Sequence, residues 1–157
     1  MAVPLIPIAI GAGAAATYTA IEFIRRRRAR PATQLVREAI DSVLSRYPAA
    51  QQAGQKRNLY VVLLQRSVWW EKPRFKGKNP RYRPRSRKPC FYVGETGLEP
   101  ERRFKRHKRG YQAGKGFVRD FGQCLVGSAS VSADQAKETE EALARELQAM
   151  GCGVWWG

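Results

Sequence analysis

The sequence is poor in acidic residues, in histidine and in paired cysteines. Against 29 Lys and Arg stand 13 Asp and Glu, a formal net charge of +16. This imbalance indicates a polyanionic partner, either nucleic acid or an anionic membrane surface. The three cysteines form no CxxC pair, and one histidine cannot complete a zinc cluster, so the sequence offers no zinc site and favours buried free thiols over disulfides.

Charge is also scarce in residues 3–24, where Glu22 is the one charged side chain. About 20 apolar residues suffice to cross a bilayer core, and arginines follow at residues 25–28. A cleaved signal peptide would carry its positive charges before the apolar run. We therefore expect residues 1–30 to form a hydrophobic, membrane-spanning helix with the rest of the chain in the cytoplasm. The alternative is a soluble leader that a partner protein masks.

Residues 31–56 are predicted to be an amphipathic helix and a linker. Apolar residues recur at helical spacing over 33–47, and Pro48 ends the pattern. Residues 49–57 have the composition of a linker. The apolar stripe is expected to pack on the domain that follows, or to bridge from it to the membrane.

Two apolar runs predict strands, and a helix follows the second. Residues 59–64 are a continuous apolar run, typical of a buried strand. A second strand over 90–93 leads through a glycine-containing turn into a helix with Pro100 in its first turn and Gly110 at its end. Arg103 and His107 lie four residues apart on one face of that helix, which suits a phosphate. The alternative is a basic helix whose charges are only solvated.

The C-terminal part predicts a third strand over 121–131 and a final helix. Ser132 and Gln135 have capping-box spacing, and Gly151 ends the helix. The pattern turns one set of residues inward and leaves three acids near the helix start in solvent. The inward residues are Ala136, Leu143, Leu147 and Met150, and the solvated acids are Glu138, Glu140 and Glu141. Trp155 and Trp156 are expected to cap the core.

Residues 66–89 hold ten Lys and Arg, one Glu, four Pro and four aromatic residues. We interpret this segment as a long loop inserted between two strands. Basic side chains interleaved with Trp69, Trp70, Phe75 and Tyr82 suit phosphate contacts and stacking on exposed bases. The alternative is a disordered basic loop that touches phosphates without specificity.

Four pieces of the sequence, in order, resemble the GIY-YIG nuclease family. Tyr92-Val93-Gly94, with Thr96 and the run from Arg103 to His107, is similar to the second half of the family signature. Residues 58–64 are similar to the first half, which is a strand containing a tyrosine. Residues 141–146 match the later helix that carries an acidic residue. The resemblance implies an α+β domain over 57–157, with a three-stranded, mainly antiparallel sheet flanked by helices.

The resemblance also implies a metal-dependent endonuclease that hydrolyses DNA, with RNA as an alternative substrate. Glu146, preferred over Glu141, would bind Mg²⁺ or Mn²⁺. Tyr60 would act as a general base or orient the attacking water, and Tyr92 would support it or bind the phosphate. Arg103 would clamp the scissile phosphate, with His107 as an auxiliary acid/base or phosphate ligand.

A wider set of residues is expected to contact the substrate. It comprises Gly94, Thr96, Arg102, Arg106, Lys108, Trp69, Trp70, Arg81, Arg83 and Arg85. Such a nuclease could sit under a cytoplasmic membrane, or be a secreted toxin that acts in a target cell. The main rival is a non-catalytic nucleic-acid-binding or structural protein on the same scaffold. A membrane protein whose basic half binds anionic lipid is a third reading.

Overall fold

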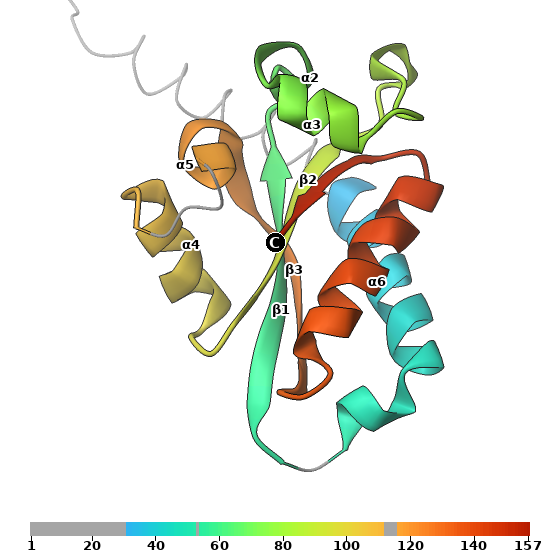
Figure 1. The fold of residues 1–157 in the computed structure, drawn as a ribbon, viewed down its shortest axis with the longest axis vertical. Helices are drawn as coiled ribbons and strands as arrows, with labels where there is room; N and C mark the ends of the chain where they lie inside the picture. The colour runs from blue at the N-terminus through green and yellow to red at the C-terminus, as the bar shows by residue number, and fades with distance from the viewer. Residues whose placement is uncertain (1–30, 53, 112–115) are drawn as a thin grey trace, which may run out of the picture.

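A computed structural model describes residues 31–157, apart from residue 53 and residues 112–115. Residues 31–46 are helical. The elements that follow are η1 (Pro48–Gln51), β1 (Lys56–Leu64), α2 (Val68–Glu71), α3 (Pro73–Lys78), η2 (Pro84–Ser86), β2 (Cys90–Thr96), α4 (Pro100–Lys108), α5 (Phe117–Phe121), β3 (Gly122–Ser132), α6 (Ala136–Ala149) and β4 (Gly153–Trp156). The predicted α+β class is confirmed, with helices flanking one sheet (Figure 1).

The sheet has four strands in the order β3-β1-β2-β4. β1 runs antiparallel to both β2 and β3, whereas β4 runs parallel to β2 and places Trp156 opposite Val93. The prediction of three strands is therefore wrong by one. β4 has only four residues and pairs in parallel with a strand that is distant in the sequence. No local sequence pattern therefore predicted it.

β1 is buried on both sides, which explains its uninterrupted apolar sequence. Leu59, Val61 and Leu63 face one side, where helix 31–46 and α6 cover the sheet. Tyr60 points to the other side with Val62 and Leu64, toward α2, α3, α4 and α5 (Figure 1). We call these the first and second faces of the sheet. Each face holds its own apolar cluster.

Helix 31–46 is amphipathic, as predicted. Val36, Ala39, Ile40 and Val43 are buried in the first-face cluster. The expected linker over 49–57 instead contains η1 and the beginning of β1. The apolar segment 3–24 lies outside the described residues. Within residues 31–52, 54–111 and 116–157, no helix is long and apolar enough to cross a membrane.

The insertion 66–89 folds, so the prediction of a long loop is wrong. α2 and α3 lie at one end of the sheet (Figure 1), and three of the four aromatic residues of the insertion are buried in the core. Phe75 and Tyr82 are buried, and the ring of Trp69 lies 5.1 Å from that of Tyr82 between centroids. Trp70, 65 % exposed, is the aromatic residue left for contacts with a partner. The many basic residues of this segment are typical of a loop, so its sequence did not predict that the aromatic residues would pack in a core.

The final helix forms, but its predicted capping box does not. Gln135 is the N-cap residue and makes no side-chain cap hydrogen bond, while the Ser132 hydroxyl donates to the carboxylate of Asp134. The Thr139 hydroxyl donates instead to the Gln135 carbonyl, at 2.7 Å. The inward positions were predicted correctly for Ala136, Leu143 and Leu147, which are buried.

Candidate active site

Two buried tyrosines meet on the second face of the sheet. Tyr60 lies opposite Gly94 in the β1–β2 ladder, and Tyr92 lies opposite Val62. Their side chains are therefore diagonal neighbours on one face, within reach of each other. The ring centroids are 6.0 Å apart. The two predicted strands, each containing a tyrosine, thus bring both phenols to one place.

Gly94 is what allows the two rings to converge. A Cβ atom at this position would lie 2.7 Å from the Tyr60 hydroxyl oxygen and 2.8 Å from Cε1 of Tyr92. Both distances are shorter than any normal contact, so a side chain at residue 94 would push the tyrosines away. We had expected Gly94 to pass close to the substrate, but the structure places it against the tyrosines.

α4 supplies two further side chains to this site, those of Arg103 and His107. It begins at Pro100 and is followed by Gly110 at φ 89°, as predicted. Nε2 of His107 lies 3.1 Å from the Tyr60 hydroxyl oxygen. Arg103, one turn earlier on the same helix, is close enough for its positive charge to oppose the rise in the Tyr60 pKa. His107 is 0 % exposed, so the solvated-face alternative is wrong for this residue, and its partner is the tyrosine.

Burial sets the protonation of these groups. Desolvation and the positive charge of Arg103 lower the pKa of His107 to about 4, so the imidazole is neutral at pH 7. Desolvation raises the pKa of Tyr60, although the nearby Arg103 opposes this rise. The pKa of Tyr92 is also raised, by burial and by Tyr60. Both phenols therefore keep their protons at neutral pH.

Glu140, which sequence reasoning placed in solvent, is the acidic residue of this site. It is 5 % exposed, and desolvation and the charge of Glu95 raise its pKa to about 7. The positive charge of Lys137 and the backbone at Glu95 and Gly157 partly offset the rise. The charge of Glu140 in turn acts on the pKa of both Tyr60 and Tyr92.

Glu140 acts on this site from α6, near the end of β4. β4 ends at Trp156, opposite Val93, whereas β2 continues to Thr96. The pKa of Glu140 responds to the charge of Glu95 and to the backbone at Glu95 and Gly157, residues that come just past that last pair. Glu140 is therefore close to the ends of β2 and β4.

A signal for Glu140 was present in the sequence. It falls in the spacing i, i+4, i+7, i+11 with Ala136, Leu143 and Leu147, the residues that α6 buries. An acidic residue inside an apolar stripe is costly unless it is paired or hydrogen-bonded. We read it as a solvated acid because it is close to the helix start, where acids are common.

Glu146 lies elsewhere. Its carboxylate accepts from Arg46 at 2.5 Å and from the Ser42 hydroxyl at 3.1 Å, both on helix 31–46. It comes six residues after Glu140, which is about 240° around a helix at 3.6 residues per turn. The structure thus brings together four of the five predicted catalytic residues, and Glu140 stands where Glu146 was expected.

Several predicted substrate contacts instead build the fold. The buried Thr96 hydroxyl accepts from the N–H of Leu98 at 3.1 Å, which shapes the turn before α4. Lys108 donates to the carbonyls of Arg119 and Gly122 at 2.9 and 3.0 Å. Trp69 is buried in the second-face cluster. None of these three is placed to grip a nucleic acid.

The remaining predicted contacts are basic residues at or near the surface. The Arg106 guanidinium lies 6.0 Å from the ring of Tyr111. The other predicted arginines are exposed, and they are Arg81, Arg83, Arg85 and Arg102. They remain available for phosphate contacts, and Arg81 also lines a pocket.

The donor set suits a hard cation held by few protein ligands. In the part of the chain that the structure describes, no three His, Cys, Asp or Glu residues cluster as a metal site. Glu140 nevertheless offers carboxylate oxygens, the ligands that Mg²⁺ prefers, and Mg²⁺ usually keeps several waters. A carboxylate has about four lone-pair sites, so it can bind a cation and still accept hydrogen bonds. The residues therefore fit a site with one carboxylate and water ligands.

Comparison with known proteins adds no assignment. No family model matches the chain. No curated protein and no solved structure matches it either. The chemistry of the site is therefore argued from its own side chains.

Proposed function

We propose that this protein is a metal-dependent endonuclease of the GIY-YIG type that hydrolyses phosphodiester bonds in DNA. One observation carries the proposal. The Tyr60 hydroxyl contacts His107 of α4, and the Tyr60 ring lies against that of Tyr92. The charges of Arg103, also on α4, and of Glu140 on α6 both act on the pKa of this hydroxyl. A phenol and a neutral imidazole can orient and deprotonate a water, and a guanidinium and a carboxylate-bound cation can stabilise the charge that develops on a phosphodiester.

The charges of the chain favour a polyanionic substrate. The net charge of +16 draws nucleic acid toward the protein. Arg103 is partly exposed, while the Tyr60 hydroxyl beneath it is buried. A planar guanidinium can bind two phosphate oxygens at once. We assign Arg103 to hold the scissile phosphate over the tyrosines.

Glu140 would hold the divalent cation, which stabilises the negative charge of the transition state and of the leaving oxygen. The other side chains position the nucleophile and move its proton. Because Tyr60 stays protonated, its hydroxyl orients the attacking water. Neutral His107, with its proton on Nδ1, can accept the Tyr60 proton at Nε2, which frees the phenolic oxygen to take a proton from water.

Plasmid nicking by the 157-residue chain in mild detergent tests this function. We expect cleavage with Mg²⁺ and none with EDTA. Arg103→Ala should lower the rate by about 10²–10³-fold, as expected for loss of one charge that stabilises a transition state. Arg109→Ala removes the same charge from the exposed end of α4 and should cleave like wild type. No metal-dependent cleavage of DNA or RNA by wild type would reject the proposal.

One observation favours the non-catalytic rival. The phenols and the imidazole are almost completely buried, and the raised pKa values make the tyrosines weak bases. A binding protein could keep such a cluster as a structural core. Binding alone, however, gives no reason to bury the Glu140 carboxylate, whose charge acts on both tyrosines, at a cost in desolvation.

A further inference from the structure

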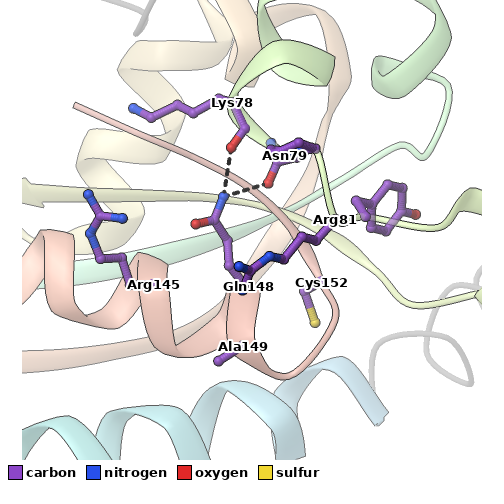
Figure 2. Close-up of a pocket in the computed structure, with 9 residues that line it drawn as sticks. Lys78, Asn79, Arg81, Arg145, Gln148, Ala149 and Cys152 are labelled. Carbon is purple, nitrogen blue, oxygen red and sulfur yellow. Dashed lines mark hydrogen bonds between the residues drawn. The ribbon is translucent and has the colours of Figure 1, made fainter.

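A pocket of about 440 Å³ lies where the insertion meets the C-terminal half of α6. Its walls come from the end of α3, the residues just after it, and α6. Figure 2 shows Arg81 reaching from the connection after α3 toward the helix that carries Arg145 and Gln148. The volume is in the range of small-ligand sites and can admit a phosphate with its sugar.

The lining of this pocket is positively charged. Arg81 and Arg145 line it, as does Lys78, whose ammonium group is bound to the Trp156 carbonyl, and none of the nine lining residues is acidic. The nearest acidic partner is Glu141, which pairs with Arg145 at 2.7 Å on the surface of α6. Such exposed pairs contribute little and are easily exchanged for another anion. The pocket therefore favours an anionic group.

The floor of the pocket is already ordered. The buried Asn79 side chain accepts from the N–H of Val154 at 2.7 Å and donates to the carbonyls of Phe75 and Val154. Gln148 donates to the Asn79 side chain at 2.8 Å and to the Lys78 carbonyl at 3.0 Å (Figure 2). These bonds join α3, α6 and β4, so the pocket needs little reorganisation to bind a ligand.

The pocket is close to the candidate active site along α6. Arg145 and Gln148 come five and eight residues after Glu140, which is roughly 8–12 Å along the helix axis at about 1.5 Å per residue. Lys78 donates to the Trp156 carbonyl at 3.0 Å, and the backbone of the next residue, Gly157, is close enough to lower the pKa of Glu140. The two sites thus share the end of β4.

We propose that this pocket binds a backbone phosphate of the substrate strand, roughly two to four nucleotides from the scissile bond. The spacing follows from the distance along α6 and about 3.4 Å per nucleotide of duplex. The inference rests on the proposed function, since it assigns a second contact to the same substrate. The proposal also assigns a function to the insertion 66–89, because α3 and Arg81 form the wall of the pocket opposite α6.

The test is equilibrium binding of an oligonucleotide duplex to the 157-residue chain in EDTA. The pocket variant is Arg81→Ala/Arg145→Ala. The matched control is Arg37→Ala/Arg46→Ala, which removes two exposed arginines from helix 31–46, one of them also paired with a glutamate of α6. We expect the pocket variant to weaken binding about 10-fold and to lower the slope of log K against log salt by about 1. The control should change both far less.

Equal losses in the two variants would overturn the proposal, because the pocket would then contribute only to the general charge. Binding in EDTA does not depend on cleavage. Failure of the pocket is therefore distinct from failure of the nuclease, which would appear as wild type that does not cut with Mg²⁺.

Two further measurements fix the source and place of the phosphate. A nucleoside monophosphate should displace the duplex only at concentrations far above that of the duplex; displacement at equal concentration would assign the pocket to free nucleotide and overturn the proposal. Duplexes shortened from one end should lose the effect of the pocket variant once fewer than about four base pairs remain beside the cut. An effect independent of length would contradict the assigned position.

Discussion

The Tyr60 hydroxyl lies 3.1 Å from Nε2 of His107, and this contact joins the central strand to α4. It connects a phenol whose pKa is raised to an imidazole whose pKa is lowered, both by burial. Each group is therefore uncharged at pH 7. The contact is both part of the fold and the place where a proton can move.

The first prediction concerns the acid stability that His107 controls. The unfolded imidazole has its ordinary pKa of about 6.5, whereas the folded one has a pKa of about 4. Its contribution to stability is therefore present above pH 6.5 and is lost as the pH falls to 4, by up to about 3 kcal/mol. Urea unfolding measures the free energy of unfolding of wild type and of His107→Leu at each pH. The difference between these two free energies should change between pH 6.5 and pH 4. A difference that is constant with pH would contradict it.

Glu140 should have the opposite effect. Its folded pKa of about 7 is above that of an unfolded glutamate, so the folded state holds an extra proton in this range. Wild type should therefore lose stability relative to Glu140→Gln as the pH rises from about 4.5 to 7, by on the order of 1–3 kcal/mol. Thermal unfolding in EDTA measures this. The control Glu141→Gln, at an exposed position, should show no such trend.

Gly94 should tolerate no side chain. Gly94→Ala would place Cβ 2.7 Å from the Tyr60 hydroxyl oxygen, and we expect a loss of about 1–3 kcal/mol from overpacking. Gly97→Ala is the matched control, because nothing lies within 4 Å of its Cβ position. Denaturant unfolding of both variants gives the comparison. Equal stabilities would mean that the tyrosines do not converge as described.

The neighbouring tryptophans of the insertion should separate stability from binding. Trp69→Ala removes a buried ring and should cost about 3–5 kcal/mol in unfolding free energy. Trp70→Ala changes an exposed side chain and should stay within about 0.5 kcal/mol of wild type. If Trp70 stacks on a base, the same substitution weakens single-strand binding. Similar unfolding curves for the two variants would contradict a folded insertion.

The periodicity of apolar residues predicted much of the fold. The strands β1, β2 and β3, helix 31–46 and α6 all follow from it, whereas α4 follows from Pro100 and Gly110 at its two ends. The fold of the insertion could not be predicted from this periodicity, because its charged residues outnumber the three aromatic residues that pack in its core. β4 could not be predicted from this periodicity either, because its pairing with β2 depends on contacts between residues far apart in the sequence.

The candidate site was predictable where its residues have a fixed spacing. Arg103 and His107 are one helical turn apart, and Tyr60 and Tyr92 lie on strands that pair. Glu140 could be told from its neighbours only by its place on the buried stripe of α6. Which acid reaches the tyrosines depends on where β4 ends, and that is set by tertiary packing.

The most direct test of the account compares two conservative substitutions on α6. We expect Glu140→Gln to abolish Mg²⁺-dependent plasmid nicking while duplex binding in EDTA stays as in wild type, because the carboxylate is lost and the basic residues remain. Glu146→Gln, which breaks a bond to Arg46 on the other side of α6, should keep cleavage within a few-fold. Loss of cleavage in Glu146→Gln with activity retained in Glu140→Gln would contradict the assignment of the site.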